Sequence, residues 1–234
     1  MTTPPKSSLL IERLLNLAPR LAVFDCDGTL WSGDAGESFF DWELRRGVVS
    51  EEVVDWARAR YVDYRAGKIS EEQMCGDMVT LHDGLREEQV LALARQFFEE
   101  RFLTAVFSEM RQLVFALQDS GCEVWAVSST NEWVIRVAMD RFRIPSKQIL
   151  AASARVENGI ITGELVRIPS GIGKARAILE VIGRPPDAGF GNSRWDVEML
   201  SISRYAVAVN PNPDLEKIAR QRGWTIYWPE PPRA

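Results

Sequence analysis

Short apolar runs alternate with longer stretches of helical spacing along most of the chain. A short apolar run that ends at polar or turn residues predicts a buried strand, whereas apolar residues three and four apart predict a helix. The predicted strands are residues 21–24, 123–128, 188–190, 206–210 and 225–228, and the predicted helices between them are 130–142, 172–182, 196–201 and a segment from 214. Because this alternation is typical of parallel strands joined by right-handed crossovers, the predicted fold class is α/β with a doubly wound parallel sheet.

Two further segments extend this pattern. Asn158 and Gly159 form a strong turn signal between the apolar segments 148–155 and 160–166, which predicts a β-hairpin. Residues 8–18 have the apolar spacing of a helix, so we expect a short helix that covers the sheet.

The segment from about residue 34 to 103 contains no convincing buried strand. Its predicted helices are residues 37–46, 51–65, 70–81 and 87–102. Gly47, Gly67 and Gly84 mark the breaks between these helices. The expected organisation is therefore an α/β core of residues 1–33 and 104–234, into which a helical domain of residues 34–103 is inserted.

Composition narrows the functional classes. The chain has 234 residues, 46% of them hydrophobic and 26% charged, which is ordinary for a globular protein. A net charge of -5 gives no support for nucleic-acid binding, and no apolar run has membrane-spanning length. The N-terminus lacks the regions of a signal peptide, and Cys26, Cys75 and Cys122 have no metal-type spacing. We therefore expect a cytoplasmic protein that binds no nucleic acid and no membrane.

Two carboxylates follow the first predicted strand. Asp25 and Asp27 are two apart, so they point roughly the same way if the strand continues through them. Two negative charges at such a short distance repel each other unless a cation binds them. Magnesium is the usual cation where carboxylates also meet a phosphate. Two solvated aspartates in a loop are the simpler alternative, but that alternative leaves the sequence Gly28-Thr29-Leu30 unexplained.

The sequence D-C-D-G-T-L at residues 25–30 resembles the first motif of the haloacid-dehalogenase-like superfamily. The resemblance implies that Asp25 is a nucleophile and that Asp27 is the acid/base of a phosphatase. Dehalogenase members of that superfamily lack the second aspartate, so its presence here implies phosphoryl transfer.

Two later segments resemble the second and third motifs. Residues 127–130 end an apolar strand with hydroxyl side chains, and the resemblance places Ser128 on the phosphate and Ser129 beside it as an amide donor. Lys174 lies in the first turn of a predicted helix, where the helix dipole disfavours a cation. An exposed lysine is the ordinary alternative, whereas the resemblance makes Lys174 the cation that neutralises the phosphate.

Residues 190–196 resemble the fourth motif, G-D-x-x-x-D, with one departure. Asn192 replaces the first acid, and Asp196 keeps the second. The implied magnesium ligands are Asp25, Asp27, Asn192 and Asp196. An amide oxygen ligates a hard cation without adding charge, so the departure predicts weaker metal binding.

Together the four motifs predict a magnesium-dependent phosphatase that acts on a small phosphomonoester through an aspartyl-phosphate. The inserted helices resemble the cap domain of the phosphoserine-phosphatase-like branch. Two alternatives remain open. A phosphotransferase or mutase would use the same residues, and a non-catalytic phosphate-binding module would account for Asn192.

The cap sequence predicts the kind of substrate. Asp34 lies nine residues after the expected nucleophile, where phosphoserine phosphatases carry an acid for the substrate's ammonium, although a helix N-cap is an equal alternative. Met78 stands where those enzymes carry an arginine for the carboxylate. With Trp31 as the best aromatic candidate, and Phe39, Trp42 and Trp56 as further ones, the pattern predicts a cationic head group without a carboxylate. The alternative is that these aromatics form the core of the cap, and for Trp56, in mid-helix, that alternative is favoured. The single histidine, His82, is expected to be solvated at a helix end.

Overall fold

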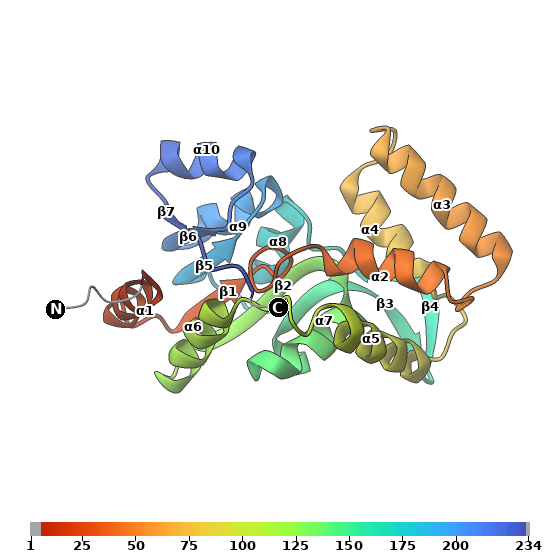
Figure 1. Ribbon diagram of the computed structural model, residues 1–234, viewed down its shortest axis with the longest axis horizontal. Helices are drawn as coiled ribbons and strands as arrows, with labels where there is room; N and C mark the ends of the chain where they lie inside the picture. The colour runs from red at the N-terminus through yellow and green to blue at the C-terminus, as the bar shows by residue number, and fades with distance from the viewer. Residues whose placement is uncertain (1–5, 233–234) are drawn as a thin grey trace.

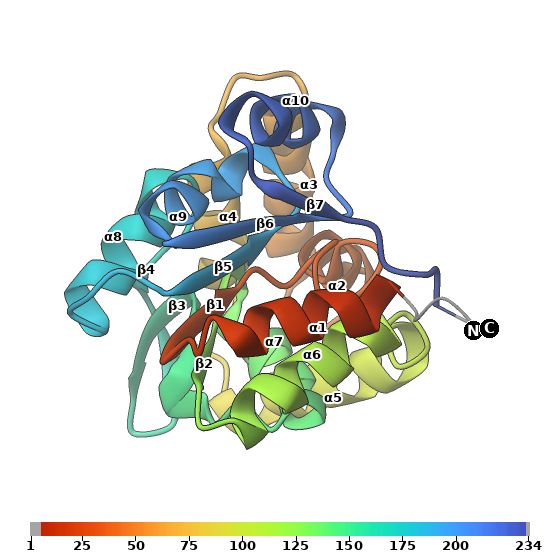
Figure 2. The ribbon, with the colours of Figure 1, turned by 90° about the vertical axis from the view of Figure 1, so that its left-hand side faces the viewer.

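Seven strands form one sheet in the computed structural model, which describes residues 6–232 (Figures 1 and 2). The strands are β1 Leu21–Phe24, β2 Glu123–Asn131, β3 Ile149–Glu157, β4 Ile160–Arg167, β5 Ala188–Gly191, β6 Tyr205–Val209 and β7 Thr225–Tyr227. Their order is β4-β3-β2-β1-β5-β6-β7, and the pairs are parallel except for the hairpin of β3 and β4. The predicted fold class is confirmed. Residues 1–5 and 233–234 of the predicted core lie outside the described range.

Helices cover both faces of this sheet. The helices are α1 Lys6–Asn16, α2 Ala35–Leu44, α3 Glu51–Arg65, α4 Glu71–Thr80, α5 Glu87–Arg101, α6 Ser108–Asp119, α7 Glu132–Met139, α8 Ile172–Val181, α9 Val197–Ile202 and α10 Pro213–Arg222, with short 3-10 turns at Asp140–Phe142, Ser146–Gln148 and Arg194–Asp196. Figure 2 shows α1, α6 and α7 on one face and α8, α9 and α10 on the other. Within residues 6–232, no helix combines the length and the apolar character that crossing a membrane requires.

Two helices differ from the prediction. Helix α6 was not predicted, although Met110, Leu113, Val114 and Leu117 bury one helical face. Its N-cap residue, Phe107, makes no side-chain capping bond, so the usual start signal is missing. Helix α7 begins two residues later than predicted, because β2 continues to Asn131. The Asn131 side chain then caps α7 by accepting a hydrogen bond of 3.1 Å from the Val134 amide.

The helical segment after β1 divides between two hydrophobic clusters. Phe39 of α2 and Phe97 of α5 belong to the same buried cluster as Phe24 of β1. Helices α3 and α4 instead pack on each other, with Ala57 and Met74 in a separate cluster. Figure 1 shows α3 at the outer edge of the molecule, with α4 between it and the sheet. Helix α3 therefore lies on the far side of α4, whereas α4 itself contacts β2, β3 and β4 of the sheet.

The sheet order brings three motif-bearing segments together. Phe24, the last residue of β1, pairs with Ala126 of β2 on one side and with Phe190 of β5 on the other. In a doubly wound sheet, the carboxyl ends of strands at such a change in order form the ligand-binding crevice. The residues that follow these three strands therefore meet at one edge, which helix α4 approaches from the cap.

Candidate active site

A cavity of about 490 Å³ lies between the carboxyl ends of the strands and helices α2, α3 and α4. The predicted site residues that line it are Asp25, Asp27, Asp34, Met78, Ser129, Lys174 and Asn192. Two more predicted residues, Ser128 and Asp196, are buried behind the cavity surface, with exposed fractions of 1% and 0%. The fold thus gathers residues that lie up to 171 positions apart at one end of the sheet, from Asp25 to Asp196.

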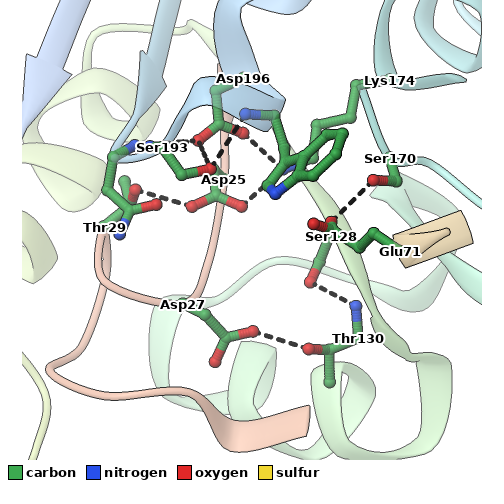
Figure 3. Close-up of polar contacts among 12 residues, drawn as sticks. Asp25, Asp27, Thr29, Glu71, Ser128, Thr130, Ser170, Lys174, Ser193 and Asp196 are labelled. Carbon is green, nitrogen blue, oxygen red and sulfur yellow. Dashed lines mark hydrogen bonds and ion pairs between the residues drawn. The ribbon is translucent and has the colours of Figure 1, made fainter. Parts of the chain in front are cut away.

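Lys174 joins the predicted nucleophile to the end of the fourth motif. Its Nζ lies 2.6 Å from Asp25 Oδ1 and 2.6 Å from Asp196 Oδ1 (Figure 3). Thr29 donates a hydrogen bond of 2.8 Å to the other Asp25 oxygen. Burial and the charge of Asp196 raise the pKa of Asp25 to about 6, against the lowering effect of Lys174. Burial alone would lower the pKa of Lys174, but the two carboxylates raise it, so the ammonium stays charged.

Asp27 is held by three donors. Its Oδ1 accepts hydrogen bonds from Trp31 Nε1 at 2.8 Å and from the Ala35 amide at 2.6 Å. Its Oδ2 accepts one from Thr130 Oγ1 at 2.7 Å (Figure 3). Burial and the charge of Asp34 raise the pKa of Asp27 to about 7, although the donors lower it. A carboxyl group with a pKa near neutrality is suited to both giving and taking a proton.

Trp31 does not contact the cavity, so its predicted role as the best aromatic contact for the substrate is wrong. Its side chain is fully buried against Phe98 and Phe142, and its indole N–H donates a hydrogen bond to Asp27. Phe39 and Trp42 are also core residues, whereas Trp56 of α3 is 41% exposed and does not line the cavity, so the expectation that it is a core residue is wrong. The cap aromatics that line the cavity are instead Tyr61 and Tyr64, both from α3.

The hydroxyl residues at the end of β2 have separate roles. Ser129 and Thr130 line the cavity. Ser128 is buried, and its Oγ accepts a hydrogen bond of 3.1 Å from the Thr130 amide. Thr130 was not predicted as a site residue. The signal that could have found it is the run of three hydroxyl residues at the end of an apolar strand.

The fourth motif forms a tight turn around Asp196. Asp196 Oδ2 accepts hydrogen bonds from the amides of Asn192 and Ser193 at 3.0 and 2.9 Å, while Oδ1 accepts from Lys174. Gly191 permits this turn, because a Cβ there would lie 2.5 Å from the Asp196 Cβ. Asn192 lines the cavity, and its amide group fills the space beside Gly28, where a side chain would collide with it.

The four predicted magnesium ligands do not form a ready-made cage of acids. Within residues 6–232, no group of three or more His, Cys, Asp or Glu side chains is arranged to hold a metal ion. The side chains of Asp27 and Asp196 are already engaged by three and four protein contacts, respectively. This leaves Asp25 and Asn192 as the predicted ligands whose side chains face the cavity without that degree of engagement. Magnesium commonly binds through one or two carboxylates together with waters and substrate phosphate, so these two residues fit such a site.

The cap side of the cavity is acidic. Asp34 lines the cavity and is also the N-cap of α2, since its Oδ1 accepts a hydrogen bond of 2.8 Å from the Glu37 amide. Glu71, in the first turn of α4, also lines the cavity, and it was not predicted as a site residue. Its Oε1 accepts a hydrogen bond of 2.8 Å from Ser170 Oγ (Figure 3). Met78 lines the same cavity.

Two of the known proteins with similar sequences are named as phosphatases. The histidinol-phosphatase of Neisseria meningitidis serogroup C is 24% identical over 217 residues, which cover 88% of this chain and 97% of that protein. The phosphoserine phosphatase SerB1 of Mycobacterium tuberculosis is 28% identical over 215 residues, which cover 88% of this chain and 69% of that protein.

Solved structures share the fold. A protein of unknown function from Bordetella pertussis Tohama I superposes with a TM-score of 0.77 at 24% identity, over 89% of this chain and 97% of that one. A substrate-bound phosphoserine phosphatase superposes with a TM-score of 0.57 at 18% identity, over 89% of this chain and 92% of that one.

The family assignment rests on the sequence itself. Residues 22–201, which contain all four motifs, match the family described as haloacid dehalogenase-like hydrolase. That match covers well over half of the chain, and it includes the inserted helices as well as the sheet residues around the cavity. The chain therefore belongs to the haloacid dehalogenase-like hydrolases, as the resemblance of its four motifs implied.

Proposed function

We propose that this hydrolase is a magnesium-dependent phosphatase that cleaves a small phosphomonoester through an aspartyl-phosphate on Asp25. One observation carries the proposal: the buried Asp25 carboxylate faces the cavity beside the Lys174 ammonium, with Asp27 near it at a pKa of about 7. Nucleophilic attack on phosphorus and proton transfer to the leaving oxygen require such an arrangement of two carboxyl groups.

The chemistry follows from the two carboxyl groups. Asp25, with a pKa of about 6, is largely ionised at neutral pH, so one of its oxygens attacks phosphorus without an activating base. Asp27 gives its proton to the departing alcohol oxygen as the ester bond breaks. Asp27 then takes a proton from the water that attacks the aspartyl-phosphate, which releases phosphate and restores Asp25. A group with a pKa of about 7 is populated in both of the required forms at neutral pH.

The remaining residues bind and orient the phosphoryl group. The Lys174 ammonium is fixed by Asp25 and Asp196, so it meets the phosphoryl oxygens without reorganisation. Asp25 and Asn192 would hold magnesium together with a phosphate oxygen. When bound, that ion neutralises charge on the transferring group.

The charge of the cavity supports a cationic substrate. Among the described residues that line it, five are carboxylic acids and one, Lys174, is a cation. No lining residue from the cap is positively charged within residues 6–232, so a substrate carboxylate would have no partner there. An amino-alcohol phosphate has the opposite character, since it is cationic away from its phosphate. Histidinol phosphate belongs to this class, and the similarity to a histidinol-phosphatase supports it.

Two other functions use the same cavity. A phosphotransferase or mutase would pass the phosphoryl group from Asp25 to a second hydroxyl instead of to water. A non-catalytic phosphate-binding module is favoured by one observation, the neutral Asn192 at a predicted metal position. We propose a cytoplasmic setting for any of the three, because the three cysteines within the described residues are free thiols.

The test is a panel of phosphomonoesters, with and without magnesium. We expect phosphate release from histidinol phosphate, phosphoethanolamine and phosphocholine in preference to phosphoserine and a neutral sugar phosphate. Asp25→Asn, which is nearly isosteric, should fold but lose essentially all turnover, and trapping with a metal fluoride should label only the parent. Substantial activity in Asp25→Asn would exclude the covalent route. Transfer without release would identify a mutase or phosphotransferase, and neither activity would favour the binding module.

A further inference from the structure

Glu71 reaches from the cap to the segment of the core that precedes α8, at the wall of the cavity. It lies in the first turn of α4, and its Oε1 accepts a hydrogen bond of 2.8 Å from Ser170. Ser170 is 8% exposed and precedes α8, the helix that carries Lys174. Figure 3 shows the Glu71 side chain directed towards this segment. The contact therefore fixes a cap carboxylate at a set position relative to the phosphate-binding ammonium.

We infer that Glu71 is a specificity-determining residue: its carboxylate receives the cationic group of the substrate and so selects cationic phosphomonoesters over neutral ones. The inference rests on the proposed function and adds a specific residue, its partner and a measurable preference to it.

The geometry leaves Glu71 free to bind a ligand. Ser170 engages Oε1, and no hydrogen bond from residues 6–232 engages Oε2. Glu71 lines the cavity that also contains the nucleophile Asp25. A cavity of about 490 Å³ suits a small molecule that touches both groups at once. The free oxygen is thus available to a substrate whose phosphate lies at Asp25 and Lys174.

The electrostatic surroundings favour a cation at this point. Burial, with smaller contributions from the charges of Asp196 and Asp34, raises the pKa of Glu71 to about 7, against the lowering effects of the Ser170 hydrogen bond and of Lys174. Without a ligand, the carboxyl group is therefore protonated in a substantial fraction at neutral pH. A bound ammonium favours the ionised form, so a cationic ligand and a charged Glu71 stabilise each other.

Glu71 has a stronger position for discrimination than Asp34. Asp34 is the more exposed of the two side chains, although burial still raises its pKa, and its Oδ1 is used in capping α2. Glu71 is partly buried, where a charge pair is screened less by water. Removing the Glu71 charge should therefore cost a cationic ligand more than removing the Asp34 charge.

The experiment compares Glu71→Gln with Glu72→Gln. Glutamine keeps the shape of Glu71 and an oxygen for Ser170, while Glu72 is an exposed acid in the same helical turn and outside the cavity. For each variant, kcat/KM is measured with phosphoethanolamine and with the neutral glycerol phosphate. Glu71→Gln should lower kcat/KM for phosphoethanolamine by about 10- to 100-fold, the size of one charge-assisted hydrogen bond, and change glycerol phosphate by less than about threefold. Glu72→Gln should change neither.

A binding measurement separates this inference from the proposed function. Calorimetry with phosphoethanolamine and glycerol phosphate, in the Asp25→Asn background, needs no turnover and should show the same selective loss in Glu71→Gln. If the parent hydrolyses no phosphomonoester but the selective loss of binding remains, the phosphatase proposal fails and the Glu71 inference stands. If the parent is an active phosphatase and Glu71→Gln affects both ligands equally, or neither, the role of Glu71 is wrong.

Discussion

Thr130 Oγ1 donates a hydrogen bond of 2.7 Å to Asp27 Oδ2, which joins the end of β2 to the proposed acid/base of the site. The other Asp27 oxygen is held by Trp31 and by the Ala35 amide at the start of α2. Burial and the charges of Asp34 and Asp25 raise the pKa of Asp27, and the hydrogen bonds from Ala35 and Thr130 lower it, so its value of about 7 is a balance between these effects. A change to any of these effects should move the pH dependence of catalysis.

Thr130→Val should shift that pH dependence to higher pH. The substitution keeps the shape of the side chain but removes the donor that stabilises the ionised form of Asp27. Its pKa should then rise by about one unit, since a hydrogen bond to a charged group contributes about 1.5–3 kcal/mol and one unit corresponds to about 1.4 kcal/mol. The measurement is kcat as a function of pH, with Thr130→Ser as the control that keeps the hydroxyl. An unchanged profile in Thr130→Val would show that this bond does not tune Asp27.

Gly36→Ala should reproduce much of this effect from the opposite side of the contact. A Cβ at Gly36 would lie 2.6 Å from Thr130 Oγ1, so the two must shift apart, and we expect the shift to lengthen the hydrogen bond from Thr130 to Asp27. Alanine favours a helix by about 1 kcal/mol over glycine, so stability should not fall for lack of helix propensity. We expect the pH profile of Gly36→Ala to move as in Thr130→Val, by the same assay. In the double variant the two shifts should not add, and full additivity would show that the two residues act separately.

The sequence predicts the α/β sheet, and most of the site residues predicted from it line the cavity at the edge of the sheet or lie buried behind it, because short-range patterns carry that information. The apolar run 21–24 followed by Asp25 and Asp27 can be recognised as a strand that ends at a pair of acids from the sequence alone. Side-chain direction is a different matter. Trp31 follows the catalytic turn, yet its indole points into the core and back to Asp27, a choice made by contacts with Phe98 and Phe142.

Residues whose role depends on distant partners were missed. Glu71 has the sequence signature of an ordinary first-turn acid, and only the packing of α4 brings it to Ser170, 99 positions along the chain. His82 lies in a polar stretch, but it is fully buried, so the prediction of a solvated histidine is wrong. Its neighbours, Glu43 and Trp133, are 39 and 51 positions away, and no local pattern specifies them.

Asn192→Asp should tighten magnesium binding by at least about tenfold, because it adds a negative charge beside the cation without changing side-chain shape. The parent should bind magnesium weakly until phosphate supplies further oxygens and charge. Titration calorimetry of both proteins, with and without inorganic phosphate, measures the two effects. Equal magnesium affinity in the parent and in Asn192→Asp would count against Asn192 as a ligand.

Removing one partner of the buried pair of His82 and Glu43 should destabilise the protein strongly, because the other partner would remain buried without a hydrogen-bond partner. His82 Nε2 lies 2.8 Å from Glu43 Oε2, and both side chains are inaccessible to solvent. Burial raises the pKa of Glu43; it opposes protonation of His82, but the Glu43 charge raises the pKa of His82 overall. The charge of Glu43 therefore favours the protonated form of His82, and His82 in turn favours the ionised form of Glu43.

Glu43→Leu should lower the free energy of unfolding by about 3–5 kcal/mol, because it leaves the His82 Nε2 buried without a partner. The double variant Glu43→Leu/His82→Leu should recover part of that loss, since two apolar groups replace a desolvated pair in which Glu43 Oε1 already lacks a hydrogen-bond partner. Urea unfolding at constant m-value measures both, and Asp41→Ala, which removes an exposed acid from the same helix, should change stability little. If the double variant loses as much as the sum of the two single variants, the pair acts as two independent packing groups rather than as a coupled one.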